Sequence, residues 1–270
     1  MFKKKLFLFL LGTIVIVLFF TFRSFEKTKP AQTTSAFILP HNPIFSSEIK
    51  DTLLGGPHPN QITTVIVFGP NHQDLGPHII GSSNPLTKKL RVNIDQKLIE
   101  GEHSFKILEP FLANQYPQAQ IIPFIFRKGQ TVNQITTWTN KLKAELESDK
   151  SLVIASVDFA HYLDQETSLK NDQATFRLIE NHNYELINTL GSDHFDCPAC
   201  LIALLEITRF KSLQPIVLKN KYQDGTSYFL IAFQPPNTTP TPTPAIITLL
   251  AAGDLSLSRE INYQIKQKQN

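Results

Sequence analysis

The stretch TVIVFGPNH (residues 64–72) is an unbroken apolar run that ends in a short turn carrying His72. Two further runs have the same design, AFILPH (residues 36–41) and SLVIASVDFAH (residues 151–161), and both end at a histidine. Short apolar runs bounded by turn residues are typical of buried strands in a parallel sheet. Polar side chains at the ends of such strands meet in one crevice of an open α/β sheet. The sequence therefore predicts an α/β domain with a metal or acid–base site at its strand ends.

The rest of the chain extends this pattern into a compact domain over residues 36–234. We expect a three-layer α/β fold, with a mixed sheet flanked by helices. Further strands are expected at residues 90–94, 120–126, 215–222 and 227–233. Helices are expected at residues 104–114, 132–147, 166–190 and 198–210. Pro123 favours an edge position or a bulge for its strand, because proline cannot donate a ladder hydrogen bond.

The composition restricts the class of protein. The chain has 270 residues, of which 41 % are hydrophobic and 18 % charged, as in globular proteins. Its two cysteines exclude a disulfide framework as the basis of the fold. The net charge is only +3, and no basic face with interleaved aromatic residues is evident, so we expect no nucleic-acid partner.

The N-terminus predicts a membrane anchor over residues 1–25. An uncharged run of residues 6–22 follows three lysines, and its length is near the lower limit for a spanning helix. A cleavable signal peptide fits less well, because the run ends in the bulky sequence FTFRSF rather than in small residues. The lysines favour the cytoplasmic side, so we expect a single-pass membrane protein whose main domain lies outside the cytoplasm. Residues 26–35 are expected to form a linker.

The C-terminus predicts a second unit. Residues 235–244 read PPNTTPTPTP, which indicates a stiff, extended linker. Residues 245–270 contain one further apolar run, which is too little to bury a core, so we expect this stub to belong to a longer domain. The stretch LAAGDLSLSR (residues 250–259) resembles the opening of CapA-type capsule (poly-γ-glutamate) synthesis proteins. That resemblance implies that Asp254 is a metal ligand in a complete domain of this type.

Three side chains suit a transition-metal site. His41 and His72 end two predicted strands, and Cys197 lies at the predicted start of a helix, where free N–H groups favour a thiolate. Two imidazoles and a thiolate leave metal positions open for water or substrate. The alternative is structural: the histidines would bond to loop carbonyls, and Asp158 would be a turn or helix-capping residue.

The sequence CPAC (residues 197–200) supports a different reading of the same cysteine. A C-x-x-C pair at a helix start suggests thiol–disulfide chemistry, especially outside the cytoplasm. Thioredoxin-like pairs directly follow a strand, whereas residues 191–196 are polar here. Cys197 and Cys200 are therefore a candidate redox pair, and a disulfide between them would block metal binding by Cys197.

A set of short motifs resembles the MEMO family, also called AmmeMemoRadiSam system protein B. The motifs occur in the family's order: LPH (39–41), FGPNH (68–72), EHS (102–104), PFL (110–112), IIP (121–123), SVDFAHY (156–162), and Cys197 followed by LL (204–205). The resemblance covers residues 38–233. It implies a fold and a site position similar to those of class III extradiol dioxygenases. The chain departs from the family pattern at Asn42, Lys106 and Pro198.

The resemblance also implies roles for individual residues. The family's metal ligands fall on His41, His72 and Cys197, and other pocket residues fall on His103, Asp158 and His161. It implies iron as the metal, with copper as an alternative, and AMMECR-type and radical SAM system proteins as partners. Zinc is a further candidate for a site of this ligand type.

These observations lead to one expected function and two alternatives. We expect a membrane-anchored, MEMO-like metal-binding protein with iron- or copper-dependent oxidoreductase or dioxygenase-type chemistry. The cysteine ligand argues against simple ring cleavage, because that site normally has two histidines and a carboxylate. The first alternative is a non-catalytic binding or scaffold module of an envelope or capsule-synthesis system. The second is a C-x-x-C thiol–disulfide redox protein.

Overall fold

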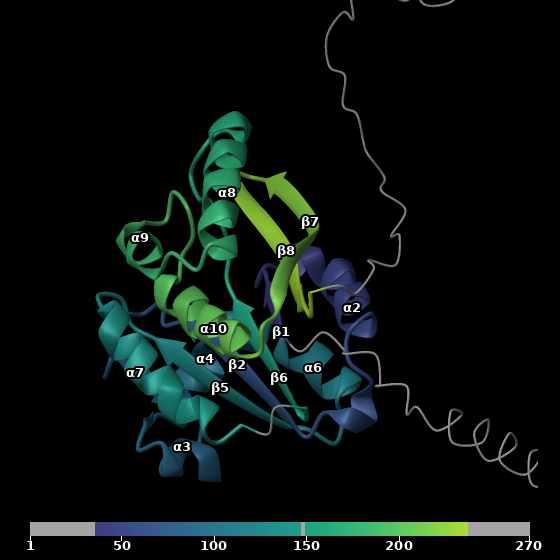
Figure 1. The fold of residues 1–270 in the computed structure, drawn as a ribbon, viewed down its shortest axis with the longest axis vertical. Helices are drawn as coiled ribbons and strands as arrows, with labels where there is room; N and C mark the ends of the chain where they lie inside the picture. The colour runs from purple at the N-terminus through teal and green to yellow at the C-terminus, as the bar shows by residue number, and fades with distance from the viewer. Residues whose placement is uncertain (1–35, 147–148, 237–270) are drawn as a thin grey trace, which may run out of the picture. The chain divides into compact units, whose positions relative to one another are not determined.

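The computed structural model describes residues 36–146 and 149–236. Over these residues the chain forms an eight-stranded mixed sheet with helices against both of its faces (Figure 1). The strand order is β4-β3-β5-β2-β6-β1-β8-β7. The prediction of an α/β fold with a mixed sheet flanked by helices is confirmed.

The strands and helices have the following bounds. The strands are β1 (Ala36–Leu39), β2 (Thr64–Pro70), β3 (Ile79–Gly81), β4 (Asn93–Ile94), β5 (Gln120–Phe126), β6 (Ser151–Ser156), β7 (Gln214–Gln223) and β8 (Thr226–Gln234). The α-helices are α2 (Ser46–Leu54), α3 (Pro85–Lys89), α4 (Gln96–Gly101), α5 (His103–Lys106), α6 (Glu109–Gln115), α7 (Val132–Lys143), α8 (Gln165–Glu180), α9 (Tyr184–Thr189) and α10 (Pro198–Phe210). Two short 3-10 helices are η1 (Pro43–Phe45) and η2 (Pro59–Gln61).

The three apolar runs that end at histidines form the centre of the sheet. Strand β6 lies between β1 and β2 and pairs with both in parallel. Because the three strands are parallel neighbours, their carboxyl ends lie at the same edge of the sheet. The loops that carry His41, His72 and Asp158 therefore begin side by side.

Alternate residues of these central strands pack into two separate cores. On β1, Ala36 and Ile38 face the core under α7, α8, α9 and α10, whereas Phe37 and Leu39 face the core under α2, α4, α5 and α6. Strands β2 and β6 alternate in the same way. Burial on both faces explains why these strands are continuous apolar runs.

Strand β5 corrects one prediction. Pro123 does not put it at an edge, because β5 pairs with β2 on one side and with β3 on the other. The carbonyl of Pro123 accepts a hydrogen bond from the N–H of Ser82, just beyond β3. A strand residue directs its N and O to the same side, so the missing N–H faces the end of the short β3, where no ladder bond is needed.

The predicted helix at residues 166–190 is two helices, α8 and α9. The break lies at Asn181–Asn183, where His182 has φ +50°. Asn183 then caps α9 by accepting a hydrogen bond from the N–H of Leu186. The predicted helix at 104–114 is likewise divided into α5 and α6.

Smaller differences concern short elements. The strand expected at 90–94 is reduced to β4, because Arg91 takes a positive φ of 56° in the turn before it. Helices α2, α3 and α4 and strand β3 were not anticipated. By contrast, the hairpin of β7 and β8 turns at Asp224 and Gly225, as expected, and both have positive φ.

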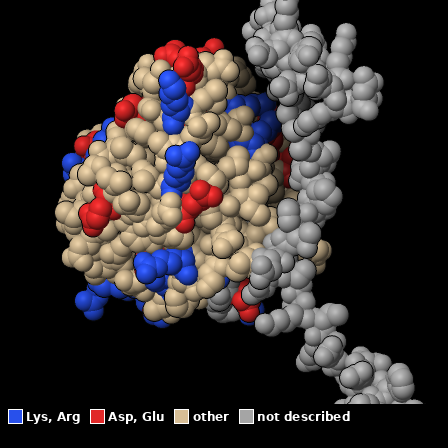
Figure 2. Space-filling model, turned by 45° about the horizontal axis from the view of Figure 1, so that its top comes forward, with Lys and Arg blue, Asp and Glu red and all other residues tan. Residues whose placement is uncertain are grey.

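Several predicted segments lie outside the described residues. These are the anchor (1–25), the first linker (26–35), most of the second linker (235–244) and the stub (245–270) with its CapA-type resemblance. Within residues 36–146 and 149–236, no helix has both the length and the apolar character needed to cross a membrane. On the face in Figure 2, Lys and Arg side chains are interspersed with Asp and Glu among other residues.

A buried carboxylate on α8 fixes the loop that follows β6. Asp172 is fully buried, and its carboxylate accepts hydrogen bonds from Ser227 Oγ at 2.6 Å and from Asn220 Nδ2 at 3.1 Å. The backbone of Ser227 in turn accepts from the N–H of Phe159 and donates to the carbonyl of Ala160. Asp172 therefore holds the segment that carries Asp158.

We expect Asp172→Ala to lower the free energy of unfolding by about 2–4 kcal/mol, because it leaves buried polar partners without an acceptor. Urea denaturation measures the change. Glu166→Ala is the matched control on the same helix, since the side chain of Glu166 is exposed and forms an ion pair with the exposed Lys170, and its effect should stay below about 0.5 kcal/mol. Equal effects of the two substitutions would contradict the role given to Asp172.

Candidate functional site

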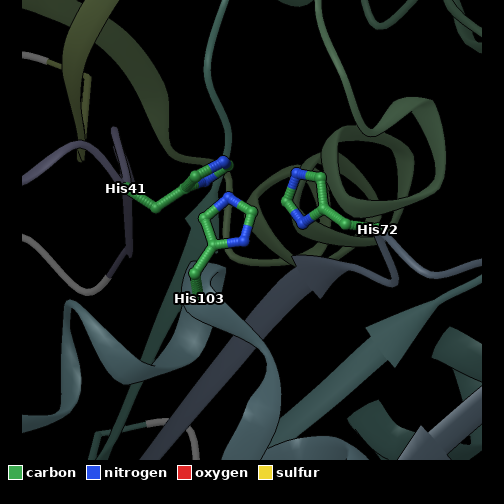
Figure 3. Close-up of side chains that lie close together, drawn as sticks. All are labelled: His41, His72 and His103. Carbon is green, nitrogen blue, oxygen red and sulfur yellow. The ribbon is translucent and has the colours of Figure 1, made fainter.

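Three histidines converge beyond the carboxyl ends of the central strands (Figure 3). His41 follows β1, His72 follows β2, and His103 begins α5. Each offers a ring nitrogen, and these three atoms lie within 4.8 Å of one another. His41 is buried, whereas His72 and His103 are exposed, so the cluster has one closed side and one open side.

Glu102 fixes the ring of His72. One carboxylate oxygen of Glu102 lies 2.7 Å from His72 Nδ1, and the other accepts the backbone N–H of His72 at 3.0 Å. Because an ionised carboxylate can only accept, Nδ1 carries the proton of that contact. The free nitrogen of a neutral His72 is therefore Nε2, on the other side of the ring. Such carboxylate contacts hold ligand histidines in a single tautomer.

Ser156 fixes the tautomer of His41. Ser156 Oγ donates its one proton to the carbonyl of Ser104 at 2.6 Å. At the 3.3 Å contact with His41 Nδ1, Ser156 Oγ must therefore accept, and the ring must donate. This again leaves Nε2 of His41 as the nitrogen free to bind a metal.

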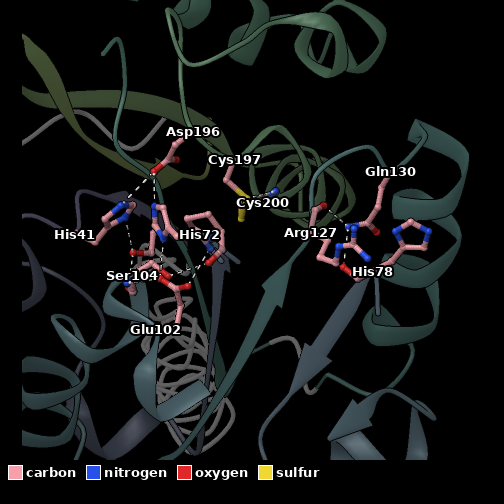
Figure 4. The surroundings of a disulfide bond; sticks show 12 residues. His41, His72, His78, Glu102, Ser104, Arg127, Gln130, Asp196, Cys197 and Cys200 are labelled. Carbon is pink, nitrogen blue, oxygen red and sulfur yellow. Dashed lines mark hydrogen bonds and ion pairs between the residues drawn. A yellow bond between two sulfur atoms is a disulfide. The ribbon is translucent and has the colours of Figure 1, made fainter. Parts of the chain in front are cut away.

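Two aspartates face that nitrogen. Asp196 Oδ2 lies 3.1 Å from His41 Nε2 and 3.7 Å from His72 Nε2 (Figure 4). Asp158 accepts the backbone N–H of His41 at 3.0 Å, and its Oδ2 lies 3.6 Å from His41 Nε2. The carboxylates supply the negative charge that a cation or a protonated imidazole needs at this place.

The carboxylates shift the pKa values of the histidines. Burial lowers the pKa of His72, but the hydrogen bonds to Asp196 and Glu102 outweigh it and raise the pKa to about 9. The pKa of His41 is also raised, because Asp196 and Asp158 outweigh its burial. The pKa of His103 is lowered by burial and by the charges of His72 and His41.

The pKa values of the three carboxyl groups around the cluster are shifted in different directions. Burial raises the pKa of Glu102, but the hydrogen bonds from His72 and Ser104 bring it down to about 2. Histidine contacts likewise hold the pKa of Asp196 below its usual value despite burial. Burial keeps the pKa of Asp158 raised. Protons of the metal-free site are therefore held on His41 and His72.

The cysteines differ from the expected ligand set. Cys197 does cap α10, but its Sγ is bonded to Cys200 in a disulfide. The third imidazole beside His41 and His72 is His103 instead. A disulfide sulfur has no thiolate to offer a metal. The assignment of Cys197 as a ligand thus applies to the reduced protein, for which it stays a prediction.

The remaining pocket residues divide into two groups. His103 is a member of the histidine cluster, and Asp158 contacts it. His161 lies on the loop after β6, where its ring packs near Tyr162 and its Nδ1 is buried with no hydrogen-bond partner among the described residues. Its expected role in the pocket stays a prediction.

Two functional residues were missed from the sequence. Glu102 stands in the EHS motif, and Asp196 directly precedes Cys197, so both were adjacent to residues already singled out. Their importance depends on contacts with His72 and His41, which are far away in the chain. No local pattern carries that information.

A close backbone approach next to the site predicts a sensitive position. A Cβ added at Gly69 would lie 2.5 Å from Ser104 Oγ and 3.2 Å from Ser104 Cβ. We expect Gly69→Ala to displace α5, lower the free energy of unfolding by about 1–3 kcal/mol and weaken metal retention. Gly101→Ala is the control, because nothing lies within 4 Å of its added Cβ. Thermal melting and metal analysis report both effects, and a Gly69→Ala protein that matches the control would refute the expectation.

Fold and site together define an α/β protein with a candidate metal centre at the ends of parallel strands. The family model described as Memo-like protein matches residues 81–209. The matched segment contains His103, Asp158 and Asp196, whereas His41 and His72 precede it. Together with the relatives below, this match shows that the chain is MEMO-like. No comparison supports the CapA-type resemblance of the C-terminal stub.

Several curated relatives are MEMO1 family proteins. The protein from Metallosphaera sedula is 25 % identical over 188 residues, which cover 60 % of this chain and 66 % of the relative, slightly less than two thirds of its length. The protein from Sulfolobus acidocaldarius is 23 % identical over 238 residues, which cover 76 % and 81 %. A crystal structure of an uncharacterized protein from Escherichia coli K12 aligns at a TM-score of 0.49 and 12 % identity, over 74 % of this chain and 99 % of that one, which is too weak to support a functional argument.

Proposed function

We propose that this protein is a MEMO-like, metal-dependent oxidoreductase with dioxygenase-type chemistry. The observation that carries the proposal is the cluster of His41, His72 and His103, whose ligand atoms lie within 4.8 Å of one another. Three imidazoles suit iron, copper or zinc, and the resemblance to the MEMO family favours iron.

The surroundings of the cluster fit a bound cation. The contacts of Ser156 with His41 and of Glu102 with His72 leave both Nε2 atoms free. Asp196 is 11 % exposed at its side chain, and its carboxylate oxygens have no hydrogen-bond partner among the described residues beyond these ion-pair contacts. In the metal-free site the raised pKa values of His41 and His72 favour protonated rings that balance the charge of Asp196, and a bound cation would take over that role. When bound, the metal would supply Lewis-acid or one-electron redox chemistry at its open side.

The residues around the metal would each have a separate role. His41 would close the inner side of the site, and the exposed rings of His72 and His103 would border the side that substrate reaches. Asp196 Oδ2 would accept a hydrogen bond from a substrate hydroxyl or a water there and so orient it, since it lies beside both Nε2 atoms. Glu102 would keep the proton of His72 on Nδ1 and away from the reacting groups.

Metal analysis of the full chain tests the proposal. The protein is purified without oxygen, stripped with EDTA, and reloaded with Fe(II), Cu(II) or Zn(II) in separate samples. We expect about one ion per chain and a higher melting temperature after loading. Oxygen uptake by the iron-loaded sample would then be measured with candidate reductants. A chain that binds none of the three ions would overturn the proposal and favour the non-catalytic binding module.

The proposal extends to location and partners. The uncharged run at residues 6–22 after three lysines supports a single-pass anchor with the main domain outside the cytoplasm. The resemblance to the MEMO family supports AMMECR-type and radical SAM system proteins as partners. Alkaline extraction of membranes tests the anchor, and release of the chain with peripheral proteins would contradict it.

A further inference from the structure

A cavity of about 430 Å³ lies beside the histidine cluster. One wall comes from the loop between β5 and α7, with Arg127 and Lys128. Another part of the lining comes from the segment that leads into α10, with Asp196 and Cys197. This volume is within the range of cavities that bind small molecules. The cavity therefore reaches Cys197, one of the two residues of the disulfide.

The two sulfur-bearing residues are not equivalent. Cys197 lines the cavity and is 3 % exposed, whereas Cys200 does not line it and is fully buried within α10. The backbone N–H of Cys200 donates a hydrogen bond to Cys197 Sγ at 3.2 Å (Figure 4). A solute in the cavity thus meets Cys197 first, and a negative charge on Cys197 Sγ already has a donor.

We propose that Cys197–Cys200 is an exchangeable disulfide, and that the cavity admits its partner, an anionic thiol of low molecular mass. The thiolate of the partner attacks Cys197 Sγ, forms a mixed disulfide, and releases Cys200 as a thiolate that takes up a proton. A second thiolate then attacks the partner's sulfur and releases Cys197. In total, two thiols are oxidised to one disulfide, and the protein gains two electrons and two protons.

The charge of the cavity supports an anionic partner. Among the described residues that line it, Asp196 is the one carboxylate, and it faces His41 and His72. Arg127 forms an ion pair with Asp74, and Asp74 also interacts electrostatically with Lys128, so the two cations exceed this carboxylate by one positive charge. This excess leaves a positive field that attracts a negatively charged thiol.

Trapping of the mixed disulfide tests which sulfur reacts. Full-length Cys200→Ser protein is treated with EDTA and then with oxidised glutathione, and the product is mapped by mass spectrometry. We expect rapid glutathionylation of Cys197. The matched Cys197→Ser protein should react at least about tenfold more slowly at Cys200, because that residue is buried. EDTA keeps this result separate from any metal bound by the histidines.

Two results would overturn the proposal. One is equal or faster reaction of Cys200 in the Cys197→Ser protein. The other is wild-type protein whose disulfide reduced glutathione opens only in denaturant. Circular dichroism confirms that each variant is folded. If a variant does not fold, the first mixed disulfide trapped on the wild-type protein decides the question. The proposal requires it on Cys197, and a mixed disulfide on Cys200 would contradict the proposal.

A charge reversal tests the class of thiol. We expect Lys128→Glu to slow reduction by glutathione about 3- to 10-fold and to accelerate reduction by cysteamine, which is cationic. High salt should diminish both changes. A substitution that changes the two rates in the same direction, or neither rate, would refute the anionic selectivity.

Discussion

Iron retention by the His103→Ala protein is expected to fall from about one ion per chain to less than about a tenth of that value. His103 supplies one of three imidazole nitrogens, and His72 and His41 alone would leave a bidentate site. The ring of His103 is classed as exposed, and its partial burial together with the charges of His72 and His41 lowers its pKa. Its removal should therefore cost little stability, so the loss of metal would report ligation rather than unfolding. Metal analysis and thermal melting of the same sample measure the two quantities.

Two controls make the result decisive. His58→Ala removes an exposed histidine outside the cluster and should retain the wild-type metal content. Cys197→Ser should also retain it, if the metal is held by the three histidines. The opposite pattern, with metal lost in Cys197→Ser and kept in His103→Ala, would contradict the histidine triad and favour the ligand set of His41, His72 and Cys197.

The central strands could be predicted because their signal is local. Strands β1, β2 and β6 are continuous apolar runs bounded by turn residues, and burial on both faces requires that pattern. The short elements could not be predicted in the same way. Strand β3 has only three residues and depends on pairing with β5, and the break between α8 and α9 depends on one residue with positive φ.

The residues of the candidate site also differ in whether the sequence alone could predict them. His41 and His72 could be singled out because each ends a buried strand. The place of His103 beside them could not, because α5 reaches the site through contacts of Ser104 with Pro70 and Ser156 that join distant parts of the chain. The cysteines show a further limit, since the spacing of CPAC suits both a metal ligand and a disulfide, and the sequence alone does not decide between them.

Metal binding is expected to strengthen steeply between pH 6 and pH 8. The pKa of His72 in the metal-free site is raised to about 9, so its ring holds a proton at Nε2 over this range, and Asp196 and Asp158 raise the pKa of His41 above its usual value as well. A metal must displace these protons. Each displaced proton contributes a factor of about ten in affinity per pH unit, and two give up to about a hundredfold. The strengthening should level off near pH 9, where His72 loses its proton without help.

The stability of the metal-free protein should decrease as the pH rises, whereas metal affinity increases. A histidine whose pKa is raised from 6.5 to about 9 on folding stabilises the folded state fully below pH 6.5, and this contribution is lost as the pH rises to 9. Glu102, with a pKa of about 2, stays ionised throughout and adds no slope. Melting temperatures should therefore fall with pH in EDTA, while the stabilisation by zinc grows. Glu102→Gln should flatten the slope in EDTA, because it removes the carboxylate that holds the proton of His72. Zinc affinity that does not vary between pH 6 and pH 8, measured against a competing chelator, would show that the histidines of this cluster are not the ligands.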